Sequence, residues 1–327
     1  MILRFLKSNQ AYHFILIPLV TLALWTASLI RPELYPYFGG EAEMLLYKPL
    51  QELLAGSALV SSTLAAALAV LLSFVILRLN TAYACIRIRT FLPSNIFILI
   101  IGGLYTMHHL HPVYFGALFL MLCIDRIFDA YESPGIHSNA FDAGFFIGLG
   151  SLFYFNLVFY FPAIWIGFIL IRKSPQWRNF ALPLIGLLLP WLFGFSYYFL
   201  TDRTEEMLIT VSRNILTPNN DLFRNIHMQI FAGFLAFLTL LGSFFLIGRL
   251  GEKKISSRKY FQILFVVFAI SVALLVVVPA VSLEVFVLMA IPLAFLISNY
   301  LIFMRSGFWA NLFLYLLIGL VIYLQFV

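Results

Sequence analysis

The chain has 327 residues, of which 63% are apolar and only 10% are charged, and its 20 Lys and Arg outnumber its 14 Asp and Glu. A soluble protein averages about 25% charged residues, so this composition excludes a soluble globular protein, a disulfide scaffold, a disordered hub and a nucleic-acid-binding protein. It predicts a single all-α integral membrane domain over residues 1–327, because no polar stretch is long enough to form a second core.

Apolar segments between polar breaks predict a polytopic bundle of about eleven spans. A full crossing needs about 20 apolar residues, and fewer where a helix lies inside a bundle. The pairs within 94–124 and 141–171 are short, and each pair can alternatively enter and leave the membrane on one side. The predicted spans are 12–30, 57–77, 94–108, 112–124, 141–155, 157–171, 180–200, 226–248, 260–279, 283–303 and 308–326.

The distribution of Lys and Arg predicts the orientation. With the amino terminus in the cytoplasm, 15 of these residues fall on inward segments and 5 on outward segments. This bias is typical of a bacterial inner-membrane protein, here with a periplasmic carboxy terminus. The basic net charge therefore needs no anionic substrate, although the cluster within 249–259 also suits anionic lipid head groups.

The first external loop carries the first candidate site. Glu41 and Glu43 follow Gly39-Gly40, which lets backbone approach a ligand closely. Two carboxylates here suit a divalent cation or a general base, and solvated loop acids are the alternative. Residues 45–54, with their leucines near one face, predict a helix lying flat at the membrane surface.

Two further outward segments hold candidate substrate-binding residues. His108, His109 and His111 are suited to contact phosphate or a metal, or to hold a turn, although His108 and His109 cannot share one helical face. In the loop 201–225, residues 204–215 predict a short interfacial helix. Arg213 and Arg224 there can grip a phosphate, or they are solvated.

Ionisable residues within the spans are few. Glu284 lies near the outer start of the tenth span and Asp142 near the inner start of the fifth, with Asn156 between the fifth and sixth. No span has an ionisable residue at its midpoint, which argues against an ion-driven transporter. Nucleotide-binding and standard hydrolase motifs are absent from the sequence.

Residues 139–156, the run Phe161-Pro162-Ala-Ile-Trp165 and residues 178–186 resemble an uncharacterised integral-membrane family of Bacteroidota. More distantly, the layout is similar to that of the C-type glycosyltransferase superfamily. Both have a first span, an acidic external loop with a flat helix, and then paired short spans. Those enzymes use polyprenyl-phosphate sugars, and the resemblance implies that Glu41 or Glu43 is the base or a metal ligand. The acidic pair of that superfamily usually includes aspartate, which Glu41-Ala-Glu43 lacks.

Three functions are compatible with the sequence. The first is a glycosyltransferase that handles a polyprenyl-phosphate-linked sugar at the periplasmic face, using Glu41 or Glu43 with phosphate contacts from histidine or arginine side chains. The second is a non-catalytic membrane scaffold or assembly partner, and the third is a carrier for a lipid or small molecule. Membrane lipids are the partners expected in each case.

Overall fold

The computed structural model is all-helical: 80% of the chain is helix, and no strand occurs among the residues that the structure describes. Those are all residues except 1–2, 4–5, 9, 34, 39, 55–56, 132–135, 172–175, 220–224 and 327. The α-helices are α2 (His13–Ile30), α3 (Lys48–Leu54), α4 (Ala58–Tyr83), α5 (Leu92–Gly102), α6 (Pro112–Asp129), α7 (Ile136–Ser151), α8 (Phe161–Ile171), α9 (Arg178–Leu200), α10 (Thr204–Leu216), α12 (Ile226–Gly248), α13 (Ile255–Val277), α14 (Val285–Phe303) and α15 (Gly307–Leu324). The 3-10 helices are η1 (Glu41–Glu43), η2 (Tyr105–His108), η3 (Phe155–Tyr160) and η4 (Leu250–Glu252).

Each of the eleven predicted spans coincides with a helix, but only some of these helices have the length of a full crossing. Among the described residues, seven are long and apolar enough, namely α2, α4, α9, α12, α13, α14 and α15. Their number and composition are those of a multi-pass membrane protein.

The other four predicted spans correspond to α5, α6, α7 and α8, which are too short or too polar to be counted as full crossings, so the count of eleven is not confirmed. Helix α5 has 11 residues, about 16 Å at 1.5 Å per residue, which is half of the hydrocarbon thickness. The predicted span 94–108 ends early, because helix α5 stops at Gly102 and η2 follows. Helix α6 carries Asp125, Arg126 and Asp129 at its end.

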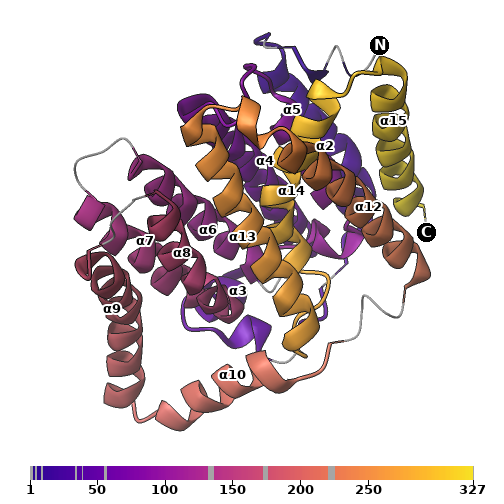
Figure 1. The fold of residues 1–327 in the computed structure, drawn as a ribbon. Helices are drawn as coiled ribbons and strands as arrows, with labels where there is room; N and C mark the ends of the chain where they lie inside the picture. The colour runs from indigo at the N-terminus through magenta and orange to yellow at the C-terminus, as the bar shows by residue number, and fades with distance from the viewer. Residues whose placement is uncertain are drawn as a thin grey trace.

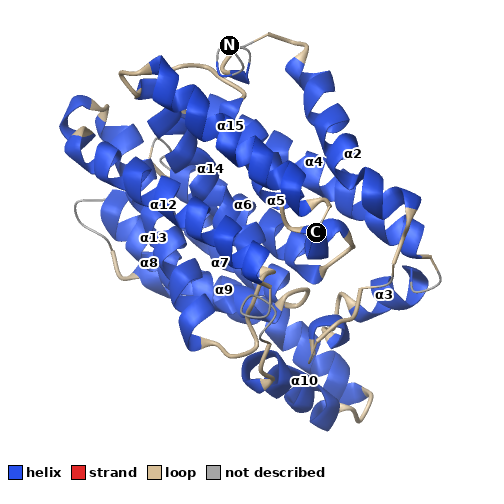
Figure 2. Ribbon diagram, turned by 90° about the vertical axis from the view of Figure 1, so that its right-hand side faces the viewer, coloured by secondary structure: helices blue, strands red, loops and turns tan. Residues whose placement is uncertain are grey.

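Helices α5 and α14 form the centre of the bundle (Figure 2). All 11 residues of α5 are buried, and so is every residue of α14 except Tyr300 and Phe303. In the other six long helices, between 28% and 39% of an 18-residue stretch is buried. Those helices expose large apolar side chains, for example Leu19, Ile185, Phe193, Phe244 and Val276, as a lipid-facing surface requires.

Helices α7 and α9 touch backbone to backbone through glycines. A Cβ added at Gly144 would lie 2.0 Å from Pro183 O, and one at Gly148 would lie 2.5 Å from Leu187 O. Small residues permit this close approach between membrane helices. The pattern Ala143-Gly144-x-x-x-Gly148, which carries part of the family resemblance, therefore has a packing function in this fold.

The loops gather at the two ends of the bundle. One end, which we call the carboxylate end, holds residues 31–33, 35–38, 40–54, 103–111, 152–156, 201–219 and 278–284 (Figure 1). Helix α10 lies crosswise over this end, below α8 and α13 in Figure 1. Residues 84–91 and 249–257 lie at the other end, the basic end. These groupings match the predicted alternation of sides, with the carboxylate end corresponding to the predicted outward face.

Candidate functional site

Hydrogen bonds between distant loops hold the carboxylate end together. Asn219 N donates to Pro279 O at 2.9 Å, and Leu46 N donates to Leu152 O at 3.1 Å. The Tyr37 hydroxyl donates to Leu110 O at 2.8 Å. The loops therefore form one layer over the ends of the inner helices, and polar side chains from all of them point into it.

Glu41 is the first buried acid of this layer. It begins η1, directly after Gly40, and only 7% of it is exposed. Its Oε2 accepts a hydrogen bond from Phe38 N at 3.0 Å and lies 3.4 Å from His111 Nε2. Its Oε1 has no hydrogen-bond partner in the described part of the chain. A buried carboxylate oxygen without a partner is costly, which marks this position as a candidate for function.

His111 is the histidine that contacts Glu41. The imidazole caps the start of α6, where its Nδ1 accepts a hydrogen bond from Val113 N at 3.1 Å. A ring nitrogen that accepts a hydrogen bond carries no proton, so the neutral ring has its proton on Nε2. The Nε2 atom, 3.4 Å from Glu41 Oε2, is therefore a donor, and it has no hydrogen-bond partner among the described residues.

Glu284 is the second buried acid, and it lies just before α14 with 1% of its surface exposed. Its Oε1 accepts hydrogen bonds from Ser282 N at 2.9 Å and from the Tyr154 hydroxyl at 3.4 Å. Burial raises the pKa of Glu284 to about 8, and the negative charge of Glu41 adds to the rise. Glu284 therefore retains its proton at neutral pH.

A small cavity beside Glu41 lies beneath α10. Its volume is about 10 Å³, which is room for about one water molecule. The Oδ1 of Asn156 is a second buried atom here without a partner among the described residues. The cavity is lined by Phe38, Gly40, Glu41, Asn156, Arg213, Asn214, Thr217 and Ala280.

Two ion pairs and a close contact at one glycine hold α10 in place over this cavity. Arg213 binds Glu43 at 3.0 Å, and Lys48 binds Glu206 at 2.8 Å. A Cβ added at Gly40 would lie 2.4 Å from Asn214 Nδ2, so only glycine permits this contact. The predicted helix 204–215 is confirmed as α10, and the predicted helix 45–54 is present as the shorter α3.

The structure separates the two glutamates of the first loop. Glu41 turns inward to His111, whereas Glu43 is 39% exposed and turns outward to Arg213. Within the described residues, no three His, Cys, Asp or Glu side chains come together as a cation site needs. The side chains present therefore do not fit the divalent cation considered from the sequence. Arg224 lies outside the described residues.

The three histidines contact three different elements. His108 stacks on Trp25 of α2 with ring centroids 4.0 Å apart, and its ring bonds Ser28 Oγ and Gly102 O. His109 Nδ1 lies 3.3 Å from Ser62 Oγ of α4. Only His111 contacts one of the two buried acids. His108 and His109 therefore brace η2 against the first two long helices.

Sequence reasoning left three members of the cluster out of the site. Glu284 had a signal, because an ionisable residue at the start of a span is a functional pointer. Asn156 was noted as a polar residue between two predicted spans, and Tyr154 had no signal, because an isolated Tyr in an apolar segment is common. Their role depends on the fold, which brings residues 152–156 against the loop that precedes α14.

An apolar groove opens on the lipid-facing side between α2 and α15. Its volume is about 720 Å³ and its floor includes Leu99 of α5. Its polar members are few, and Gln325 Nε2 donates to Gly102 O at 2.6 Å at the end nearer the carboxylate end. Further lining residues are Leu16, Leu19, Ala23, Ile318, Val321 and Ile322. The groove has the shape and chemistry to take a hydrocarbon chain.

Comparison of the chain with protein-family models, with curated proteins and with solved structures finds no match. The resemblances to the Bacteroidota family and to the C-type glycosyltransferase superfamily therefore stay predictions. Function has to be inferred from the side chains at the carboxylate end, from the groove and from the membrane-protein character of the helices.

Proposed function

We propose that the protein is an integral membrane enzyme that transfers a sugar from a polyprenyl-phosphate carrier at the carboxylate end, with Glu41 as the general base. One observation carries the proposal. Two buried carboxyl groups, Glu41 and Glu284, lie at the meeting point of the loops, and within the described residues neither forms an ion pair with Lys or Arg. Burying acids without cations costs stability, and such costs concentrate at functional sites.

The two acids occupy different environments, as an acid and a base do. Glu41 lies 3.4 Å from His111 Nε2 and accepts a hydrogen bond from Phe38 N. Glu284 is fully buried close to the charge of Glu41 and has a raised pKa, which favours its neutral form. Paired titratable groups whose environments differ in this way are typical of proton-transfer sites.

The proposed transfer proceeds in one balanced step. Glu41 takes the proton of an acceptor hydroxyl, whose oxygen forms a bond to the anomeric carbon of the sugar. The bond from that carbon to the phosphate oxygen breaks, and its electron pair leaves with the polyprenyl phosphate. Protonated Glu284 donates a hydrogen bond to the bound sugar, and the groove between α2 and α15 holds part of the polyprenyl chain.

Helix α10 has to move before a sugar can enter, because the cavity of about 10 Å³ is far too small. The ion pairs that hold it are partly exposed, and such pairs contribute about 0–1 kcal/mol each. Opening is therefore inexpensive. It would release Lys48 and Arg213 from their carboxylate partners, and these two cations would then bind the phosphate leaving group.

The test is transfer by purified protein in lipid nanodiscs, with a panel of polyprenyl-phosphate sugars and measurement of the polyprenyl phosphate released. Glu41→Gln should abolish release, because an amide cannot accept the proton. Glu33→Gln is the matched control, since it neutralises an exposed acid of the same loop. Release that survives Glu41→Gln, or a panel that gives none, would remove this assignment.

The groove favours a second candidate function, that of a lipid carrier or lipid-binding component. This function needs no acid chemistry, only a hydrocarbon chain held between α2 and α15. Ala23→Trp would fill the groove, whereas Leu22→Trp changes an exposed position that does not line it. Loss of a co-purifying lipid in the first variant alone, measured by native mass spectrometry, with no sugar transfer by the wild type, would favour the carrier.

A further inference from the structure

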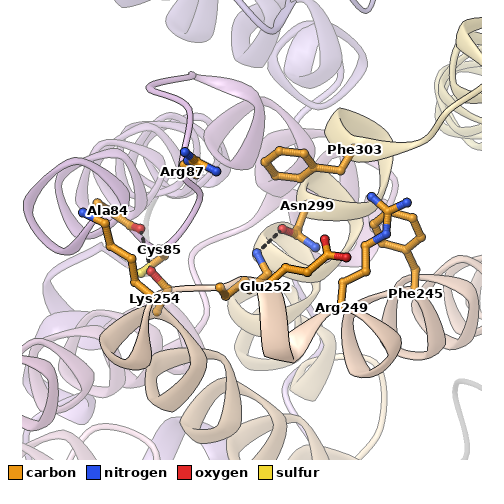
Figure 3. A pocket seen from close by; sticks show the side chains of 11 residues that line it. Ala84, Cys85, Arg87, Phe245, Arg249, Glu252, Lys254, Asn299 and Phe303 are labelled. Atoms are coloured by element: carbon orange, nitrogen blue, oxygen red, sulfur yellow. Dashed lines mark hydrogen bonds between the residues drawn. The ribbon is translucent and has the colours of Figure 1, made fainter.

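A second cavity lies at the basic end, far from the carboxylates in the fold. It is formed by the loop after α4, the end of α12 with η4, the start of α13 and the end of α14, and its volume is about 340 Å³. Figure 3 shows the side chains around this open space. The lining residues are Ala84, Cys85, Arg87, Phe245, Arg249, Glu252, Lys253, Lys254, Ser257, Asn299 and Phe303.

Four cations line this cavity against one acid. They are Arg87, Arg249, Lys253 and Lys254, and none of them forms an ion pair with any carboxylate that the structure describes. The single acid, Glu252, leaves a net charge of three positive units around the space. Cations that only satisfy the positive-inside rule would spread over the surface, whereas these converge on one concave site.

Lys253 is a partly buried member of these four cations. Its Nζ donates to Asn299 Oδ1 at 2.8 Å and lies 4.7 Å from the centre of the Phe261 ring and 5.5 Å from that of Phe303. Partial burial lowers the pKa of Lys253 to about 8, because the ammonium group lacks a compensating negative charge. An anion in the cavity would supply that charge.

The start of α13 adds backbone donors to the same cavity. Lys254 is the N-cap residue and gives no side-chain cap, so the first N–H groups of this 23-residue helix are left without one. Lys254 and Ser257, from this first turn, both line the cavity. A helix amino terminus with free N–H groups and a positive dipole end favours phosphate.

We infer that this cavity binds a phosphate group, and that its ligand is the phosphomonoester head group of an anionic lipid. Arg87, Arg249, Lys253 and Lys254 surround the phosphate, and the amino terminus of α13 faces it. The apolar lining by Phe245 and Phe303, and the exposed Phe244 and Ile247 of α12 beside it, place the cavity next to a lipid-facing surface. A lipid can therefore insert its head group while its chains stay in the bilayer. This site is independent of the function proposed for the carboxylate end.

The experiment compares two double variants that each remove two positive charges from the same end of the bundle. Arg87→Gln with Lys254→Gln alters exposed residues that line the cavity, and Arg89→Gln with Arg305→Gln alters exposed residues outside it. Each protein is placed in phosphatidylcholine nanodiscs doped with phosphatidic acid, and retained phosphatidic acid is counted by native mass spectrometry. Binding of inorganic pyrophosphate to the detergent-solubilised protein is measured in parallel by calorimetry.

The cavity variant should weaken phosphatidic acid binding by about tenfold or more, since charge-assisted contacts to phosphate are lost, and the outside variant should stay within about twofold of the wild type. Binding of phosphatidic acid without pyrophosphate supports a lipid ligand, and tight pyrophosphate binding lost in the same variant assigns the site to a soluble phosphate compound. Equal weakening by both variants, or no preference for phosphatidic acid and no pyrophosphate binding, would overturn the inference.

Discussion

The two ends of the bundle differ in the sign and in the burial of their charged side chains. At the carboxylate end, Glu41 and Glu284 are buried, and α10 leaves a cavity of only about 10 Å³. At the basic end, four cations border a cavity of about 340 Å³. The two acids are buried beneath loops and α10, whereas the four cations line a cavity that is open to solvent.

This difference indicates different chemical tasks. A covered, desolvated acid changes its proton affinity, which suits proton transfer. A partly solvated cation keeps its charge at neutral pH, which suits binding of an anion. The proton transfer proposed for the carboxylate end and the phosphate binding proposed for the basic end both follow from this difference. Four substitution experiments test this contrast.

The largest effect is expected from Glu284, whose raised pKa makes the carboxylate end sensitive to pH. The folded state keeps the Glu284 proton up to about pH 8, whereas the unfolded chain releases it near pH 4.5. Stability should therefore fall as pH rises from about 4.5 to 8, by about 3–5 kcal/mol from this group.

Glu284→Gln should flatten that part of the pH profile of thermal unfolding in detergent. Glu41 and Tyr154 act on the Glu284 carboxyl group. His111 contacts both of them, so His111→Asn is the control for titration of the imidazole. A pH profile in Glu284→Gln that keeps the wild-type slope would contradict the raised pKa.

Gly40→Val should destabilise the protein by about 2–3 kcal/mol, because the new side chain would displace Asn214 and the Thr210 carbonyl. Gly251→Val at the basic end is the matched control, since a Cβ there has no atom within 4 Å. The melting temperature should fall in the first variant and stay near the wild type in the second. Similar melting temperatures for both would show that α10 is not seated tightly on Gly40.

Lys253 predicts the opposite pH dependence for the basic end. Its pKa is about 8 in the folded protein against 10.5 for the free side chain, so stability should rise between about pH 8 and 10.5. The gain is about 1–2 kcal/mol, since partial solvation weakens the effect. The charged or titratable groups around it are Cys85, Arg87, Arg249, Glu252 and Lys254.

Lys253→Met should remove this rise and stabilise the protein at neutral pH. Thermal unfolding between pH 7 and 10.5 measures both effects, and Lys254→Met is the control for an exposed cation of the same cavity. A rise that persists in Lys253→Met would assign it to another group.

The smallest effect is expected from the ion pairs of α10. Glu43→Gln and Lys48→Gln should each change the stability by less than about 1 kcal/mol, because both pairs are partly exposed. Trypsin cleavage at Arg203 and Arg213 should nevertheless become several-fold faster, since local opening of α10 becomes easier. Glu205→Gln, at an exposed position, should leave the cleavage rate unchanged. An equal increase in this variant would show that the two ion pairs do not specifically hold α10 in place.

Much of the fold was predictable, because hydropathy and polar breaks report directly on apolar helices. Every predicted span contains a helix, and helix 204–215 was placed to within one residue. The lengths of the inner helices were not predictable in the same way. Residues 96–105 are apolar, but helix α5 ends at Gly102, and His108 and His109 at the end of η2 contact α2 and α4.

For the candidate site, the sequence predicted several of the residues but not which of them contact one another. Glu41 and His111 are polar residues in outward loops, and the fold places them 3.4 Å apart. The pairing of Glu43 with Arg213 joins residues far apart in the chain, which no local pattern encodes. The three histidines look like one group in the sequence, but each faces a different helix. Contacts of this kind depend on how the loops converge and not on spacing along the chain.

The central position of α5 has a consequence for biosynthesis. The ribosome completes α5 early, whereas α14, which packs against it, is made near the end of the chain. Until then, the buried face of α5 that packs against α14 has no partner helix. A short helix of this length is a poor substrate for the translocon on its own. Nascent chains that end before α14 should therefore be recognised by membrane quality-control proteases, and the complete chain should escape them.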